Sequence, residues 1–202
     1  MAKILVLYAS RRGQTRKIAV RIAGVLAGRS QALEIVDADH QAVPVDIAGF
    51  DLVVIAAPII AGGYPRSIVR FVRRHREELE RVRSVFVSVG LAVASRTSDG
   101  RAQSLVVVEK FVKKTGFRPG RIELVAGALP YSKYDFVTRF VMRRIAAKEG
   151  GDTDTSRDYE YTDWAAVDRF ARDLAPAGAL DASAPVPPRV NSGAPGGTHD
   201  FQ

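Results

Sequence analysis

The sequence predicts an α/β fold built on a doubly wound, five-stranded parallel sheet in the order 2-1-3-4-5. Two observations lead to this prediction: five short runs of β-branched and other apolar residues recur along the chain, and amphipathic segments with helical periodicity separate them. Strands that alternate with helices form parallel sheets whose two faces are both covered. Five such units favour an order in which a crevice opens at the carboxyl ends of strands one and three.

The first and third predicted strands are continuous apolar runs, which is typical of strands that are buried on both faces. The other three are shorter or more mixed, but they share the enrichment in β-branched residues. In chain order the predicted strands are Lys3–Ala9, Leu33–Ala38, Asp51–Pro58, Ser84–Gly90 and Arg121–Ala128.

The predicted helices place apolar residues three and four positions apart, so that one face of each helix is buried. Thr162 or Asp163 is expected to cap the last helix, because an oxygen there accepts hydrogen bonds from the first free N–H groups. The apolar positions are Ile18, Ile22, Val25 and Leu26 in the first helix; Ile68, Phe71, Val72 and Leu79 in the second; Val107, Val108, Phe111 and Val112 in the third; and Trp164, Val167, Phe170, Ala171 and Leu174 in the last.

Composition predicts one folded domain over residues 1–175 and a disordered tail over residues 176–202. The tail is rich in Ala, Pro and Gly and has few large apolar side chains to bury. The whole chain of 202 residues carries a net charge of +8, and the tail contributes −1, so the domain carries +9. A basic domain is expected to attract anions such as lipid headgroups or acidic substrates.

Several kinds of site are excluded or disfavoured. The chain has no cysteine, which excludes disulfides, thiolate metal sites and Cys nucleophiles. Its three histidines are scattered, so no metal site is expected. No apolar run approaches the ~18 residues of a membrane-spanning helix. We expect no nucleic-acid binding, because aromatic platforms interleaved with basic residues are missing.

The turn after the first strand has the features of an anion site. A helix that begins there directs free backbone N–H groups outward, and its dipole favours a bound anion. Glycine lets the backbone approach a phosphate closely, and hydroxyl groups add donors. The turn resembles the flavodoxin phosphate loop, with Arg12 in place of the middle threonine. Its residues are Ser10, Arg11, Arg12, Gly13, Gln14 and Thr15.

Two further loops are expected at the same edge of the sheet, because they follow strands three and four. Tyr64 could stack on a bound flavin ring or could anchor the next helix, and both interpretations are open. The first loop consists of Pro58, Ile59, Ile60, Ala61, Gly62, Gly63 and Tyr64, and the second of Gly90, Leu91, Ala92, Val93, Ala94, Ser95 and Arg96.

The second half of the chain carries a more specific pattern. Ala126–Tyr131 reads AGALPY, residues 150–155 read GGDTDT, and Tyr161–Trp164 reads YTDW. In this order the three strings resemble the flavodoxin-like, quinone-dependent protoporphyrinogen IX dehydrogenases, and the resemblance extends from about residue 3 to 174. It departs from that family at Ile60 and Ala61, where a basic and an aromatic residue are expected.

The resemblance implies an enzyme of haem biosynthesis that binds FMN and oxidises protoporphyrinogen IX to protoporphyrin IX. It further implies a membrane quinone, menaquinone or a relative, as the electron acceptor. The FMN contacts of the family correspond to the three loops listed above. Such an enzyme would be cytoplasmic and peripherally associated with the inner face of the cell membrane. No residue is singled out as a catalytic acid or base.

A basic amphipathic helix is predicted over residues 134–148, inserted before the last helix. Its apolar side and its cations could contact anionic lipid or cover a large tetrapyrrole, and simple packing on the domain is the alternative. The residues expected to act as membrane contact or substrate lid are Phe136, Arg139, Phe140, Arg143 and Arg144.

Three other functions are open at this stage. An electron-carrier flavodoxin is disfavoured, because such carriers are usually acidic and lack the insert. A flavin-dependent quinone reductase fed by a nicotinamide cofactor is not excluded by the loops. A flavodoxin-like binding module without FMN is the alternative from another class.

Overall fold

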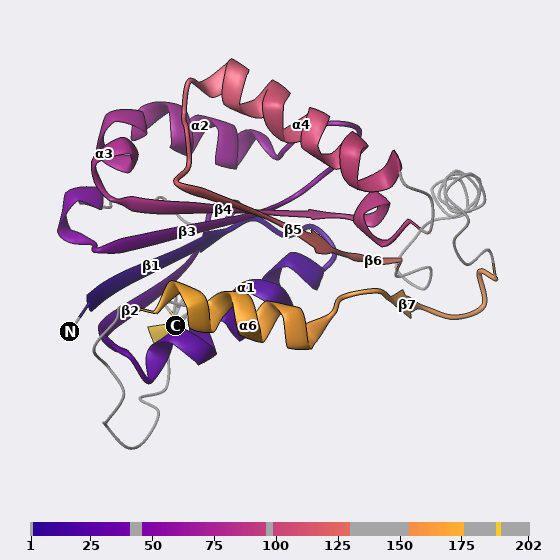
Figure 1. Cartoon of the computed structure of the whole chain (residues 1–202), viewed down its shortest axis with the longest axis horizontal. Helices are drawn as coiled ribbons and strands as arrows, with labels where there is room; N and C mark the ends of the chain where they lie inside the picture. Colours follow the sequence, from indigo (N-terminus) through magenta and orange to yellow (C-terminus); the bar gives the residue numbers. More distant parts are fainter. Residues whose placement is uncertain (1, 41–45, 96–98, 130–153, 176–188, 191–202) are drawn as a thin grey trace, which may run out of the picture.

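The computed structural model describes residues 2–40, 46–95, 99–129, 154–175 and 189–190. Five parallel strands form its centre: β1 (Ala2–Tyr8), β2 (Ser30–Asp37), β3 (Leu52–Pro58), β4 (Arg83–Gly90) and β5 (Arg121–Ala126). Their order is β5-β4-β3-β1-β2, which confirms the predicted order (Figure 1). A two-residue strand, β8 (Arg189–Val190), pairs in parallel with β2.

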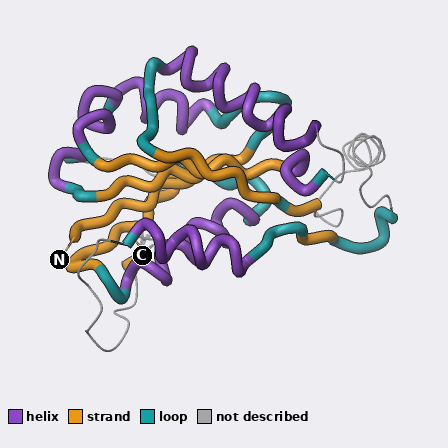
Figure 2. Tube along the Cα trace, in the orientation of Figure 1, coloured by secondary structure: helices purple, strands orange, loops and turns teal. Residues whose placement is uncertain are grey.

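Helices cover both faces of the sheet (Figure 2). On one face lie α1 (Gln14–Ala27) and α6 (Trp164–Leu174), and on the other lie α2 (Arg66–Arg74), α3 (Arg76–Arg81) and α4 (Asp99–Thr115). Two short 3₁₀ helices, η1 (Ile47–Gly49) and η2 (Leu91–Ala94), follow β2 and β4, respectively.

Alternation along β1 divides the core into two layers, because successive side chains of a strand point to opposite faces. Ile4 and Val6 belong to the layer beneath α1 and α6, whereas Leu5 and Leu7 belong to the layer beneath α2, α3 and α4. All four side chains are fully buried. The continuous apolar run that predicted a doubly covered strand therefore reflects its real environment.

The predicted boundaries need two corrections, and one of the two expected caps of the last helix is confirmed. The strand expected at Arg121–Ala128 ends at Ala126, because the chain turns at Gly127 into β6 (Ala128–Leu129), which pairs antiparallel with β7 (Tyr159–Glu160). The predicted second helix is interrupted at His75 and forms α2 and α3. Asp163 caps α6 by accepting a hydrogen bond from Ala166 N at 2.9 Å.

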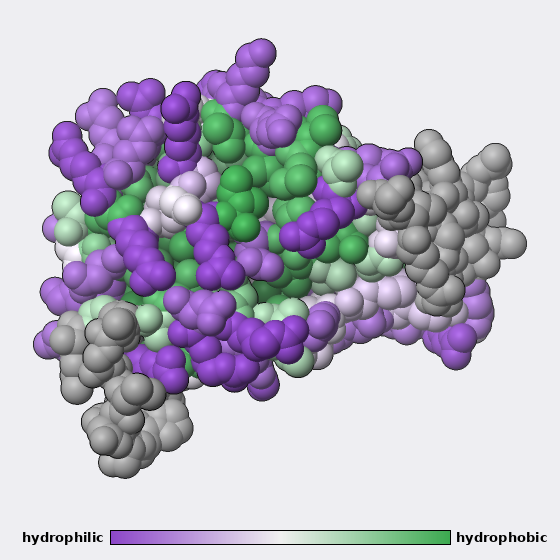
Figure 3. Space-filling model, viewed as in Figure 1, coloured by the Kyte–Doolittle hydropathy of each residue, from purple (hydrophilic) through white to green (hydrophobic). Residues whose placement is uncertain are grey.

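Part of the surface between the helices is apolar. Figure 3 shows apolar residues gathered in the region between α4 and α6, where β5 forms the edge of the sheet. Leu105 and Val106 of α4 and Ile122 of β5 are among the exposed large apolar side chains of the described residues. The predicted helix over residues 134–148 lies outside the described residues, as does the predicted tail apart from Arg189–Val190.

Two helical glycines should respond in opposite directions to alanine. Alanine favours a helix over glycine by about 0.5–1 kcal/mol, and an added Cβ at exposed Gly24 of α1 has nothing within 4 Å. Gly24→Ala should therefore raise the free energy of unfolding by about that amount. At buried Gly100 of α4 the Cβ would overlap the carbonyl oxygen of Ala92 and lie 2.5 Å from Cβ of Ser95. Gly100→Ala should therefore lower the free energy of unfolding by about 1–3 kcal/mol.

Urea denaturation of both variants measures this difference. If both substitutions changed the free energy of unfolding in the same direction, the close approach of α4 to η2 would be contradicted.

Candidate functional site

The turn between β1 and α1 has the backbone of an anion-binding loop. Gly13 is the N-cap of α1 and has φ 94°, a left-handed conformation that favours glycine. Its N–H donates to Ser10 Oγ at 3.1 Å, and its carbonyl accepts the first helical hydrogen bond from Lys17 N at 3.0 Å. The first turn of a helix has N–H groups without a helical partner, and the dipole there favours negative charge. The turn therefore has a left-handed glycine at the start of a helix, and its role as an anion site stays a prediction.

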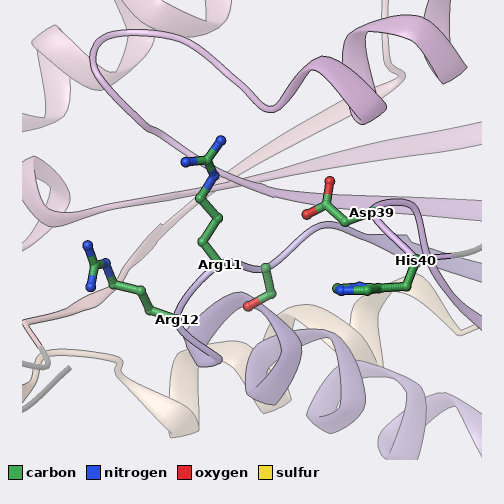
Figure 4. Close-up of a pocket in the computed structure, with 5 residues that line it drawn as sticks. Arg11, Arg12, Asp39 and His40 are labelled. Atoms are coloured by element: carbon green, nitrogen blue, oxygen red, sulfur yellow. The ribbon is translucent and has the colours of Figure 1, made fainter. Parts of the chain in front are cut away.

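An open pocket of about 500 Å³ lies beside this turn. Ser10, Arg11 and Arg12 line one side, and Asp39 and His40 line the other (Figure 4). The two arginines are exposed at the mouth of the site. Sequence reasoning did not place Asp39 and His40 here, although their position after strand two puts them at the same edge of the sheet.

Polar contacts with the end of β2 and with α2 hold the segment that follows β2. His40 Nδ1 lies 3.2 Å from Asp37 Oδ2, and Ser67 Oγ donates to Asp39 Oδ1 at 2.6 Å. Burial raises the pKa of Tyr8 above its usual value, and the negative charge of Asp37 adds to the effect. Acidic groups therefore border the arginine-bearing turn and limit how far positive charge extends along the edge.

The loop after β3 makes a tight reverse turn. Ile60 N donates to Gly63 O at 2.8 Å, and Gly63 N donates to Ile60 O at 3.0 Å. The two residues between them, Ala61 and Gly62, have φ 47° and 73°, and both are exposed. A left-handed alanine is uncommon, and such strain concentrates at functional loops. The turn presents small residues and backbone groups to the site.

Tyr64 ends this loop and points into the core. Its hydroxyl lies 2.7 Å from Ser88 Oγ, and its ring meets the rings of Phe86 and Phe111 edge-on at 5.0 Å between centroids. Burial raises the pKa of Tyr64 to about 12. These contacts are those of an anchor for α2, which is the second of the two interpretations of this residue.

The loop after β4 begins with η2 and is packed from two sides. Gly90 O accepts a hydrogen bond from Gly127 N at 3.2 Å, and Ile59 N donates to Val89 O at 2.8 Å. Gly100 of α4 lies against Ala92 and Ser95, so a residue that sequence reasoning missed fixes this loop from outside. A buried glycine at a helix start gives no distinctive sequence signal. Arg96 lies outside the described residues.

The three predicted loops follow β1, β3 and β4, so all of them lie at the carboxyl edge of the sheet. The proposed membrane contact or lid residues Phe136, Arg139, Phe140, Arg143 and Arg144 lie outside the described residues. Within the part of the chain that the structure describes, no cluster of three His, Asp or Glu residues could hold a metal ion.

The residues at this edge fit a flavin mononucleotide. A left-handed Gly13 at a helix start, flanked by Arg11 and Arg12, suits a dianionic phosphate. The loops after β3 and β4 offer backbone amides and small or apolar side chains, which suit the polar edge and the flat faces of a flavin ring. Open α/β sheets bind ligands in this crevice.

Comparison with known proteins adds independent findings. The flavodoxin domain family matches residues 5–156 of the chain. The protoporphyrinogen IX dehydrogenase (quinone) of Escherichia coli is 35% identical over 173 residues, which cover 86% of this chain and 94% of that protein. A protein of the same name from Leishmania major is 34% identical over 194 residues, covering 94% of this chain and 80% of its own length.

A solved short-chain flavodoxin associated with a bacterial microcompartment is similar in structure. It has a TM-score of 0.50 at 16% identity and covers 86% of this chain and 97% of its own. This likeness confirms the flavodoxin-like fold.

The buried hydroxyl of Tyr64 generates a prediction on pH. Tyr64→Phe should lower the free energy of unfolding by about 1 kcal/mol near neutral pH, because Ser88, which is fully buried, loses its partner. In the wild type the pKa of Tyr64 is raised from 10.0 to about 12. The unfolded chain therefore ionises first, and stability that is present below pH 10 is lost as the pH rises towards 12.

The variant has no phenol to ionise at this position. The difference in free energy of unfolding between wild type and variant should therefore be smaller at about pH 11 than at about pH 7. Urea denaturation at both values measures it. A difference that does not change with pH would contradict the buried position of the phenol.

Proposed function

The chain belongs to the flavodoxin domain family, together with the protoporphyrinogen IX dehydrogenases, and we propose that it oxidises protoporphyrinogen IX with a quinone as electron acceptor. FMN is the cofactor, and menaquinone or a related membrane quinone is the acceptor. The reaction yields protoporphyrin IX, the precursor of haem. The observation that carries this proposal is the 35% identity to the Escherichia coli enzyme over 173 residues, which cover 86% of this chain and 94% of that protein.

In this proposal three loops share the binding of FMN. The N–H groups at the start of α1 and the exposed cations Arg11 and Arg12 hold the phosphate. The loops Pro58–Tyr64 and Gly90–Arg96 hold the ring, and the packing of Tyr64 and Gly100 keeps both loops in place. When bound, FMN supplies the redox centre that takes reducing equivalents from the porphyrinogen and delivers them to the quinone.

The protein's own contribution is orientation and an electropositive approach rather than acid–base chemistry. The buried phenol of Tyr64 is neutral at physiological pH because its pKa lies near 12. The arginines at the mouth of the site attract the anionic propionates of a porphyrinogen as well as the phosphate. No described residue is assigned as a catalytic acid or base.

The proposed reaction takes place at an anionic membrane surface, where a lipid-soluble quinone concentrates. No helix in the described residues is long and apolar enough to cross a membrane. The net charge of +8 supports peripheral association. The basic segment 134–148, with Arg139 and Arg143, is the proposed contact on the evidence of its sequence.

The proposed activity is tested with the purified, FMN-loaded protein under anaerobic conditions. Protoporphyrin fluorescence should rise when protoporphyrinogen IX and menaquinone are both present, and should not rise without the quinone. Gly13→Asp should lose the flavin, because a new negative charge repels the phosphate and an aspartate at φ 94° strains the turn. A flavin-loaded protein that ignores protoporphyrinogen IX but reduces quinone with a nicotinamide donor would replace this proposal with a quinone reductase.

The proposed membrane contact is tested with anionic vesicles. Each Lys or Arg near such a surface contributes about 1 kcal/mol, and salt screens the attraction. The double change of Arg139 and Arg143 to Glu should weaken vesicle binding and slow turnover with menaquinone, while flavin content stays the same. The matched control changes Arg70 and Arg74 of α2 to Glu. These two arginines are exposed and have the same i,i+4 spacing. Equal losses in both variants would show that only total charge matters.

A further inference from the structure

The first turn of α1 is tied to a segment almost at the other end of the domain. Gln14 Nε2 donates to Thr162 Oγ1 at 2.8 Å, across 148 positions of sequence. Thr162 Oγ1 in turn donates to the carbonyl oxygen of Ala126, the last residue of β5, at 2.7 Å. Through these two hydrogen bonds the buried hydroxyl of Thr162 joins the start of α1 to the carboxyl edge of the sheet.

Glu160 and Lys17 form a second contact between the same two segments. Glu160 Oε2 accepts from Lys17 Nζ at 3.0 Å, and Glu160 Oε1 accepts from Trp164 Nε1 at 2.7 Å. Although partial burial acts to raise the pKa of Glu160, the hydrogen bonds from Lys17 and Trp164 lower it below its usual range. The carboxylate is therefore charged at neutral pH and holds the same turn of α1 that Thr162 holds.

These contacts do not involve the groups that line the pocket. Ser10, Arg11 and Arg12 line it, whereas the side chains of Gln14 and Lys17 point to Thr162 and Glu160. Gln14 and Lys17 occupy the first turn of α1, immediately after Gly13. The position of the backbone N–H groups that would meet a phosphate therefore depends on residues 160 and 162.

We propose that Thr162 and Glu160 are positioning residues that set the first turn of α1 for the phosphate of the flavin. This inference rests on the proposed FMN function and deepens it, because it assigns a role to the end of β7 and the segment that leads into α6. The role predicts discrimination between FMN and riboflavin, which differ only in the phosphate. It does not predict a change in how the ring is held.

The sign of the Glu160 effect separates positioning from simple electrostatics. Removing a carboxylate near the start of α1 would by charge alone strengthen the binding of a phosphate. Loss of positioning weakens it instead. Asp168 offers a matched control, because it also pairs with a cation of α1, Arg21, through bonds of 2.6 and 2.7 Å, one helical turn further from the loop.

The test titrates flavin-free protein with FMN and with riboflavin and follows the quenching of flavin fluorescence. Thr162→Val should weaken FMN binding by about tenfold relative to riboflavin, since the hydroxyl makes both hydrogen bonds. Thr162→Ser should restore the wild-type ratio. Glu160→Ala should weaken FMN relative to riboflavin by about threefold, and Asp168→Ala should leave the ratio unchanged.

Two outcomes would overturn the inference: an unchanged ratio of FMN to riboflavin affinity in Thr162→Val, whether or not both flavins bind more weakly, or an unchanged or higher preference for FMN in Glu160→Ala. Because Glu160 is partly exposed, Glu160→Ala decides the matter even if Thr162→Val does not fold. A wild-type protein that ignores FMN would overturn the proposed function itself, which distinguishes the two failures.

Discussion

The burial of β1 and β3 on both faces is the constraint on which the other features depend. Every side chain from Ile4 to Leu7, and from Val53 to Ala57, is fully buried. Such strands need helices above and below, and parallel neighbours need crossover connections that return each strand in the same direction. All strands therefore end at one edge, and the loops after β1, β2, β3 and β4 converge there. The site is a consequence of how the apolar runs are buried.

Apolar and polar contacts make different contributions to the pairing of α1 with α6. Val167 and Phe170 are buried against the layer that contains Ile18 and Ile22, and each buried side chain of this size contributes about 1.5–3 kcal/mol. The pair Arg21–Asp168 lies at the surface, where solvent screens the attraction between the two charges, so its contribution to stability is small. Apolar burial therefore holds the two helices together. The polar contacts are Gln14–Thr162, Lys17–Glu160 and Arg21–Asp168. They select one rotation and one axial position of α6, and of the segment that leads into it, relative to α1.

Much of the fold followed from local patterns, because buried strands and helix faces leave periodic apolar signals. The five strands were found within a few residues, and the turn from β1 into α1 was found because a helix that starts directly after a strand is a local feature. The break at His75 was missed because no Gly or Pro marks it, and the β6–β7 pair was missed because each strand has only two residues, too few for an alternating pattern. Asp39, His40, Gly100 and the Gln14–Thr162 bond were also missed. The Gln14–Thr162 bond joins residues 148 positions apart, and the close approach of Gly100 to η2 depends on how the connecting loop folds back. The orientation of Tyr64 likewise depends on its contacts with Ser88 and Phe111.

The tie between the two ends of the domain has a consequence for synthesis. A chain emerging from the ribosome presents α1 first and α6 last among the described helices, so the apolar face shared by Ile22 and Phe170 is exposed until residue 174 has left the tunnel. Domains fold as units once their chain is complete. The turn at residues 10–15, which is made early, therefore takes up its final geometry together with residues 160–174, which are made late. A nascent chain stalled before residue 160 would carry the whole turn and lack the groups that hold it.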